Sequence, residues 1–178
     1  MRVLVACESS GVVREAFREL GHEAWSCDLL PADDCIPVIK AGWDLIIMHP
    51  PCTAVAVSGN RWYGKGKPKH AERLASIEWT WALFELAKKH APRVAMENPV
   101  GVLGKATQYI QPWQFGHGET KKTGLWLHGL APLKATEVVS GREQRVWKMG
   151  PSPDRWKERS KTFAGIGSAM AAQWGGES

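Results

Sequence analysis

The sequence predicts an α/β fold: a single domain in which a mostly parallel, Rossmann-like sheet carries helices on both faces. The first observation is that residues 3–28 have the pattern strand, glycine-containing turn, helix and strand, the repeating unit of parallel sheets. The second is that two later apolar runs, residues 43–48 and 93–96, are each followed closely by a proline that ends the run. The third is a helix-length segment, residues 71–90, between those runs. A chain of 178 residues is long enough for one complete hydrophobic core.

The opening unit indicates the class of ligand. Residues 3–6 are an apolar strand, residues 8–11 are its turn, and residues 24–27 are the second strand, which ends at Asp28. The helix between the strands has an apolar face and a glycine cap, formed by Val13, Ala16, Phe17, Leu20 and Gly21. A helix amino terminus attracts anions, and a carboxylate after the second strand accepts hydrogen bonds from ribose hydroxyls. The turn lacks the G-x-G-x-x-G pattern, so the unit favours a nucleotide but not a dinucleotide.

The remaining elements follow from periodicity and from turn residues. We expect a mobile loop over residues 59–70, which are rich in glycine and lysine, and then the long helix over residues 71–90. The apolar face of that helix is marked by Leu74, Ile77, Trp81, Phe84, Leu86 and Ala87. Two further strands and a short final helix are expected at residues 93–96, 124–127 and 165–174. Residues 140–162 have little periodicity.

Composition narrows the class of protein. Hydrophobic residues make up 44% of the chain, no apolar stretch approaches the length of a membrane span, and no signal peptide precedes the first strand, so we expect a cytoplasmic protein with no membrane partner. The four cysteines form no C-x-x-C pair and have no histidine at metal-ligand spacing; they are Cys7, Cys27, Cys35 and Cys52. They are therefore predicted to be reduced thiols, with neither a metal site nor a disulfide framework.

Basic and aromatic residues are interleaved in two segments, and the net charge of +5 permits a polyanionic partner. The first segment contains Arg61, Trp62, Tyr63, Lys65, Lys67, Lys69 and His70. The second contains Arg142, Arg145, Trp147, Lys148, Arg155, Trp156, Lys157, Arg159 and Lys161. Basic side chains bind phosphates and aromatic rings stack on bases, so both segments predict contact with nucleic acid. An ordinary solvated surface with partly buried tryptophans is the alternative.

Reactive side chains stand at the ends of two predicted strands. Cys52 follows the apolar run 45–48 and two prolines, and Glu97 and Asn98 follow the next strand before Pro99 stops it. Ligands and chemistry collect at this carboxyl edge of an open parallel sheet. A strand-end cysteine alone is more often a core residue. Two such strand ends together indicate a nucleophile with a carboxylate and an amide beside it.

Five segments, which together run nearly end to end, resemble the DNA cytosine-5 methyltransferases and, more closely, the small phage-type members of that family. The segments are residues 6–14 (ACESSGVVR), 51–59 (PCTAVAVSG), 92–98 (PRVAMEN), 116–127, which holds two basic residues before a strand, and 166–170 (IGSAM). The chain departs from the family pattern at Ser9, which replaces a glycine, at Pro99, which replaces a valine, and at Ser168, which replaces an asparagine.

The resemblance implies that Cys52 adds to C6 of cytosine, so that C5 becomes nucleophilic enough to take a methyl group from S-adenosylmethionine. Glu97 would bind the N3 and N4 edge of the base, where desolvation is expected to raise its pKa. Asn98 would orient the loop that carries Cys52, and a simple turn-forming role is equally open. The basic groups that would favour the thiolate are Lys121, Lys122 and, as a weaker candidate, His49.

The implied S-adenosylmethionine site consists of Cys7, Ser9, Ser10, Gly11, Asp28, Leu29, Asp44, Pro50 and Ser168. Within this set Ser9 to Gly11 would approach the amino-acid moiety, Asp28 the ribose, and Asp44 or a neighbour the adenine edge. Double-stranded DNA with the target base flipped out would contact Ser58, Arg61, Trp62, Lys65, Arg155, Lys157 and Arg159. For Trp62, a wedge in the base stack and a loop anchor packed on the domain both stay open.

The segment of about residues 130–163 is a short insert in place of the family's target-recognition domain. The resemblance therefore implies a short or relaxed target sequence, and it leaves room for a dimer or for a separate recognition partner. Two other functions stay open: methylation of RNA or of another base position, and a cofactor- and nucleic-acid-binding module or heteromer subunit. Exocyclic-amine methyltransferases carry an aromatic residue where Cys52 stands, which argues against that chemistry.

Overall fold

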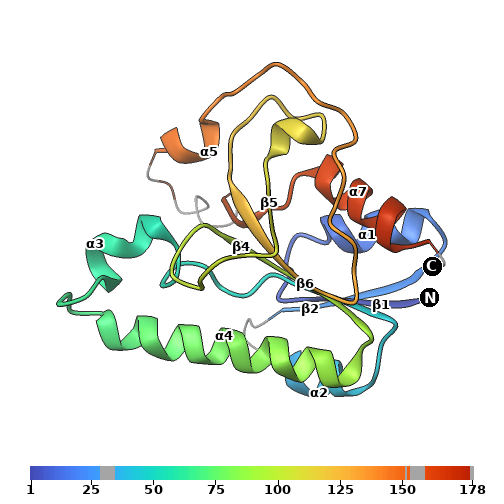
Figure 1. The fold of residues 1–178 in the computed structure, drawn as a ribbon, viewed down its shortest axis with the longest axis horizontal. Coiled ribbons are helices and arrows are strands. Elements are labelled where there is room, and N and C mark those ends of the chain that lie inside the picture. Colours follow the sequence, from blue (N-terminus) through green and yellow to red (C-terminus); the bar gives the residue numbers. More distant parts are fainter. Residues whose placement is uncertain (29–34, 151, 153–158, 177–178) are drawn as a thin grey trace.

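The computed structural model describes residues 1–28, 35–150, 152 and 159–176 (Figure 1). Its helices and strands, in chain order, are β1 (Arg2–Ala6), α1 (Val12–Glu19), β2 (Glu23–Cys27), α2 (Cys35–Lys40), β3 (Leu45–Met48), α3 (Asn60–Tyr63), α4 (His70–His90), β4 (Arg93–Pro99), β5 (Gln108–Ile110), β6 (Thr123–His128), α5 (Arg145–Lys148) and α7 (Ala164–Trp174). None of the helices in this part of the chain is both long and apolar enough to span a membrane.

The strands form one six-stranded sheet in the order β2-β1-β3-β4-β6-β5. The first four strands are parallel, β6 runs antiparallel to β4, and β5 runs antiparallel to β6. The chain moves from β1 outward to β2 and then returns to β3 on the other side of β1. Open α/β sheets bind ligands at such a reversal, outside the carboxyl ends of the two strands concerned, which are β1 and β3 here. The predicted mostly parallel, Rossmann-like α/β fold is confirmed.

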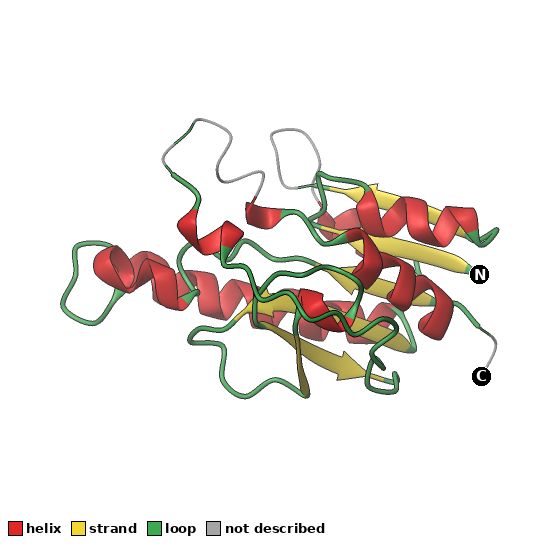
Figure 2. Ribbon diagram, turned by 90° about the horizontal axis from the view of Figure 1, so that it is seen from above, coloured by secondary structure: helices red, strands yellow, loops and turns green. Residues whose placement is uncertain are grey.

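Helices cover both faces of the sheet, with α1 and α7 on one face and α2 and α4 on the other (Figures 1 and 2). Side chains alternate between the faces, so Val3 and Val5 of β1 join the α1 and α7 cluster, while Leu4 and Ala6 join the α2 and α4 cluster. All four residues of β3 are fully buried, as expected for a central parallel strand covered on both sides.

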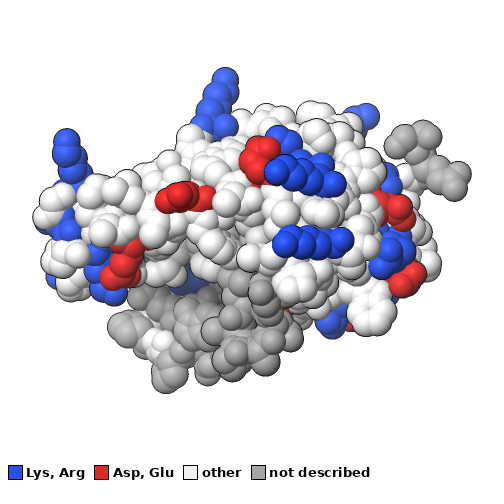
Figure 3. Space-filling view, turned by 90° about the horizontal axis from the view of Figure 1, so that it is seen from below, with Lys and Arg blue, Asp and Glu red and all other residues white. Residues whose placement is uncertain are grey.

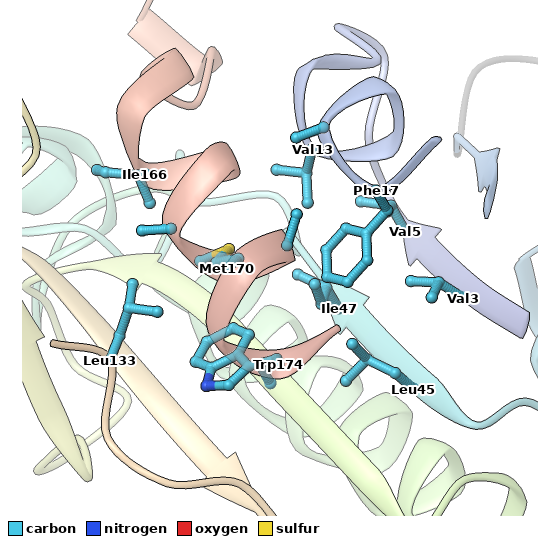
Figure 4. Packing of buried hydrophobic residues seen from close by; sticks show 14 of the residues in the cluster. Val3, Val5, Val13, Phe17, Leu45, Ile47, Leu133, Ile166, Met170 and Trp174 are labelled. Atoms are coloured by element: carbon cyan, nitrogen blue, oxygen red, sulfur yellow. The ribbon is translucent and has the colours of Figure 1, made fainter. Parts of the chain in front are cut away.

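Phe17 of α1 is the largest fully buried side chain between the sheet and the layer formed by α1 and α7. It lies near Val5 and Ile47 of the sheet (Figure 4). We expect Phe17→Ala to lower the free energy of unfolding by about 3–5 kcal/mol, because the lost ring leaves a cavity in a close-packed layer. Leu20→Ala is the matched control, since Leu20 is 55% exposed at the end of the same helix. Urea unfolding followed by circular dichroism measures both variants, and equal midpoints would contradict this assignment of the core.

Several sequence-based expectations need correction. Leu20 and Leu74 are exposed, although each was expected on the apolar face of its helix. The predicted loop 59–70 begins with a short 3-10 turn and the helix α3. The strand expected at 93–96 continues through Pro99, because β4 extends past the end of β3 and pairs there with antiparallel β6. Proline has no N–H to donate, but beyond Met96 no β3 partner requires one. The sequence did not predict α2 or β5 at all.

Candidate active site at the carboxyl edge of the sheet

The polar residues predicted from the strand ends lie together at the carboxyl edge. The pairing between β3 and β4 ends at Met48 and Met96. The residues that follow them, His49 and Glu97, therefore lie side by side. Glu97 continues the alternation that places Ala95 on the α1 and α7 face. Asn98 is its neighbour in the strand and therefore projects to the opposite face.

His49 and Glu97 form a largely buried pair. The imidazole Nδ1 lies 3.0 Å from Oε2 of Glu97, and the two side chains are only 9% and 13% exposed. Burial by itself raises the pKa of Glu97, but the hydrogen bond from His49 and the nearby charges of Lys121 and His49 outweigh it, so the pKa lies below its ordinary value. The sequence-based expectation of a raised pKa was wrong, because it considered burial without the histidine and lysine partners.

The lowered pKa makes Glu97 a carboxylate at neutral pH. A carboxyl group whose pKa is depressed by folding stabilises the fold above its unfolded pKa, and this contribution is lost as the pH falls through the lower folded value. The pair therefore contributes to stability at neutral pH and ceases to do so only in acid.

Asn98 holds the loop that carries Cys52. Its side-chain amide Nδ2 donates to the carbonyl oxygen of Pro50 at 2.9 Å, and the residue is almost completely buried. The predicted contact between Asn98 and this loop is present. After the two prolines the loop turns back on itself, since the backbone N–H groups of Val55 and Ala56 both donate to the carbonyl oxygen of Cys52.

Cys52 is partly buried, and opposing effects act on its thiol. Burial and the negative charge of Glu97 raise its pKa, while the positive charges of Lys121 and Arg159 lower it; the net effect is a pKa above the ordinary value. The positive charge of Lys121 predicted from the sequence is therefore present, but it does not outweigh the effects that raise the pKa of Cys52. The thiol is therefore protonated at neutral pH.

The two adjacent lysines have different surroundings. The charge of Lys121 acts on both Cys52 and Glu97, and its Nζ donates to the carbonyl oxygen of Lys161 at 3.3 Å. The Nζ of Lys122 instead lies over the ring of Tyr109, 4.7 Å from its centroid. The structure thus brings Lys121, but not Lys122, into the electrostatic environment of the predicted nucleophile.

Arg73 is a site residue that the sequence reasoning missed. This side chain of α4 is buried and donates to the carbonyl oxygen of Ala54 at 2.6 Å, to that of Ala56 at 3.4 Å and to Oδ1 of Asn60 at 2.8 Å. It ties the segment after Cys52 to the long helix through charge-assisted hydrogen bonds. Its position four residues before Ile77, on the inward face of the helix, was the signal that could have revealed it.

The first turn of the chain contains two residues with left-handed backbone conformations. Cys7 has a φ of 59°, which is uncommon for a residue other than glycine, and Gly11 has a φ of 71°. Hydrogen bonding with Cys35 and burial raise the pKa of the Cys7 thiol. Glu8 is buried, and its carboxylate accepts from the backbone N–H of Val13 at 2.8 Å. The amino terminus of α1 therefore already holds one carboxylate from the chain itself.

The other predicted cofactor residues are distributed unevenly. Ser9 and Ser10 are exposed in the first turn, Ser168 is exposed on α7, and Asp28 is half-buried directly after β2. Pro50 is buried after β3 and accepts the hydrogen bond from Asn98. Leu29 lies outside the described residues.

Asp44 lies at the wrong edge of the sheet for the role predicted for it. It precedes β3, and its carboxylate accepts from the backbone N–H of Arg2 at 2.6 Å. The four residues of β3 separate it from the carboxyl edge by roughly 13 Å. The prediction that Asp44 contacts adenine is therefore wrong, because Asp44 precedes β3 whereas the loop that carries Cys52 follows it.

The predicted nucleic-acid contacts are exposed in the first basic segment. Ser58, Arg61, Trp62 and Lys65 are all exposed, and Trp62, at 55% exposure, lies 5.3 Å below the Arg61 guanidinium. Trp62 is therefore not a packed loop anchor. Figure 3 shows one face of the molecule, where basic side chains at the left end lie over α3 and the start of α4, and elsewhere alternate with acidic ones. Arg159 contributes to the surroundings of Cys52, while Arg155 and Lys157 lie outside the described residues.

A pocket of about 320 Å³ adjoins the cysteine loop on the α4 side. Its lining residues are Pro51, Ala75, Ser76, Trp79 and Thr80. Thr80 is 1% exposed, and its hydroxyl is buried without a hydrogen-bond partner in the structure. The lining of the pocket is therefore partly aromatic and aliphatic, through Trp79, Pro51 and Ala75.

No family model and no curated protein matches this sequence. Among solved structures, the chain is similar to the methyltransferase EhMeth of Entamoeba histolytica, with 10% sequence identity and a TM-score of 0.49. The match covers 85% of this chain, which spans 60% of the length of that protein. A similarity of this degree does not identify the substrate or the reaction, which depend on the residues of the site.

Proposed function

We propose that this chain is an S-adenosylmethionine-dependent methyltransferase that acts on C5 of cytosine in DNA through covalent addition of Cys52. The observation that carries the proposal is the electrostatic coupling of Cys52 with Glu97 and Lys121 at the ends of neighbouring strands. A thiol, a carboxylate and a cation in one partly buried site suit nucleophilic addition to a polar aromatic ring.

The residues at the carboxyl edge of the sheet fit S-adenosylmethionine. The exposed turn Ser9 to Gly11 offers polar groups for the amino-acid moiety, and Asp28 offers a carboxylate for the ribose hydroxyls. The pocket beside Pro51 has the size and the largely apolar lining for a flat heteroaromatic ring. When bound, the cofactor supplies an electrophilic methyl group.

Glu97 links base binding to thiol activation. Burial and the negative charge of Glu97 both raise the pKa of Cys52, so the nucleophile is a thiol in the free protein. Once the carboxylate shares a proton with N3 of cytosine, that repulsion falls, and Lys121 and Arg159 then favour the thiolate. The thiolate forms a bond to C6, the ring electrons move toward N3, and C5 becomes enamine-like. The nucleophile is thus activated chiefly when a base is in place.

Access to C6 requires the base to leave the duplex. The exposed segment from Ser58 to Lys65 follows the cysteine loop in the chain, and Arg73 anchors the two to one helix. In the proposed complex, Arg61 and Lys65 contact phosphates and Trp62 stacks in the vacated position. The side chains of Ser58, Arg61, Trp62 and Lys65 are available to DNA because they are exposed.

The direct test is nucleoside analysis of DNA incubated with the purified chain and S-adenosylmethionine. We expect 5-methylcytosine as the product, detected by mass spectrometry after complete digestion. Matched RNA of the same sequence is the second substrate, and DNA without cytosine is the control. Appearance of N4-methylcytosine or N6-methyladenine, or methylation of RNA alone, would overturn the proposal.

Asp28→Ala should weaken S-adenosylmethionine binding by about 1–3 kcal/mol, the usual effect of losing a hydrogen bond to a charged group. Isothermal titration calorimetry measures the affinity. Asp44→Ala is the matched control: it removes the same carboxylate from the opposite edge of the sheet and should leave the affinity unchanged. If both variants bind as tightly as the parent chain, the ribose is not held at the end of β2.

A partner-dependent function is the second candidate, and the segment between β6 and α7 favours it. Its described residues include the four-residue helix α5, and two isolated bridges, Phe115 with Glu137 and Glu119 with Glu143, connect it to the preceding loop. A segment of this kind offers little surface for reading a long sequence. We therefore propose a short or relaxed target for the chain alone, with longer specificity supplied by a partner.

A further inference from the structure

The pairing of His49 with Glu97 carries an inference that rests on the proposed function and extends it. The backbone N–H of His49 donates to the carbonyl oxygen of Ala6 at 2.9 Å, which fixes the residue between β1 and β4. Its Nδ1 then lies 3.0 Å from Oε2 of Glu97. The other charged groups that act on this carboxylate or on the adjacent thiol of Cys52 are Lys121, ahead of β6, and Arg159, ahead of α7.

The other imidazole nitrogen has an unusual environment. Nε2 of His49 is buried and has no hydrogen-bond partner in the structure. A histidine that only orients a neighbour is usually held in one tautomer by a bond at its second nitrogen. Here no such bond fixes the tautomer, so Nδ1 can donate to an ionised Glu97 and accept from a protonated one. The contact between the two side chains survives either protonation state of the carboxyl group.

We propose that His49 is a positioning residue that holds the proton used by Glu97 during addition to cytosine. As the Cys52 sulfur bonds to C6, one proton passes from the imidazolium Nδ1 to the carboxyl group and one passes from the carboxyl group to N3, which leaves His49 neutral. After methyl transfer the C5 proton goes to water, the bond between sulfur and C6 breaks, and N3 returns its proton through Glu97 to Nδ1. Glu97 therefore passes protons on without a net change in its own protonation, both during addition and during elimination.

This assignment predicts a distinctive pH profile. Addition then requires an ionised Cys52 and a proton on the coupled pair of His49 and Glu97, so the rate depends on two ionisations and is bell-shaped. In His49→Gln the amide still donates a hydrogen bond to Glu97 but holds no transferable proton. We expect this variant to react about 10²-fold more slowly near neutral pH, the lower end of the usual contribution of general acid catalysis. Its rate should rise with pH throughout, since only the thiol ionisation remains.

The experiment measures single-turnover adduct formation with DNA that contains 5-fluorocytosine, from mildly acidic to alkaline pH. His49→Asn is a second variant, and added imidazole should partly restore the rate of His49→Ala. His22→Gln, at the opposite edge of the sheet before β2, is the control and should keep the parent rate and profile. Thermal melting establishes that each variant is folded at the pH values used.

The outcomes separate this proposal from the proposed function. If the parent chain forms no adduct with the fluorinated DNA, the proposed function and the role of His49 in it both fail. If the parent chain forms the adduct and both His49→Gln and His49→Asn keep its bell-shaped profile, the methyltransferase assignment stands. In that case His49 is only a hydrogen-bond partner, and the proton role is overturned.

Discussion

Cys52→Ser is expected to abolish methylation, with a loss of about 10⁴-fold or more, because a serine hydroxyl does not ionise at any pH the protein tolerates. The same variant should form no covalent adduct with DNA that contains 5-fluorocytosine. In the parent chain fluorine cannot leave C5 as a proton does, so the bond between Cys52 and C6 should persist through denaturing electrophoresis.

Cys27→Ala is the control for this experiment, since Cys27 is a buried core thiol at the end of β2 with no predicted catalytic role. It should form the adduct at close to the parent rate. Methylation by Cys52→Ser at a rate near that of the parent chain would show that the nucleophile has been misassigned, whatever the product of the reaction.

Glu97→Gln is expected to lower the methylation rate by about 10²–10⁴-fold while DNA binding stays within a few-fold of the parent. The amide cannot supply the proton that N3 requires. It also removes the negative charge that raises the pKa of Cys52. Alkylation of Cys52 by iodoacetamide near neutral pH should therefore become faster in the same variant that methylates more slowly.

Faster alkylation together with slower methylation would separate a catalytic role of Glu97 from a structural one. A variant that merely disturbs the fold would change both rates in parallel, or would expose every thiol. Mass spectrometry of alkylated peptides identifies Cys52 among the four cysteines. Slower alkylation together with slower methylation would contradict the proposed coupling between carboxylate and thiol.

Acid stability gives an independent check on the same carboxylate. Because the folded-state pKa of Glu97 is lowered, its stabilising contribution is present above the unfolded pKa and is lost as the pH falls through the folded value. In Glu97→Gln this component should be absent, so its melting temperature should fall less steeply in acid than that of the parent chain.

The strand ends were predictable because prolines mark them so clearly. An apolar run followed by His-Pro-Pro-Cys, and another followed by Glu-Asn-Pro, can end only near one edge of a parallel sheet. Cys52, Glu97 and Asn98 followed from that rule, and Asn98 contacts the loop as expected. The role of Asp44 came from the resemblance instead, and it failed because this residue lies directly before β3, at the opposite edge of the sheet.

Side-chain partners were the harder problem. The sequence indicated His49 only as a weaker candidate for favouring the thiolate. Its contact with Glu97 depends on the register between β3 and β4, which the sequence does not reveal. Arg73 looked like one more charged residue of a long helix, although it is buried and bonds three acceptors from the loop after Cys52. Leu74, its apolar neighbour, is the residue exposed to solvent.

The sequence by itself determined the α/β class, the alternation of strand and helix, and the delivery of a thiol and a carboxylate to one edge of the sheet. Those features depend on local patterns: apolar periodicity, glycine turns and proline stops. Only the tertiary structure decided the protonation chemistry, because a pKa depends on distances between groups far apart in the chain. Burial alone would raise the pKa of Glu97, and the positions of His49 and Lys121 lower it. Burial of Cys52 and the charge of Glu97 raise the pKa of the thiol.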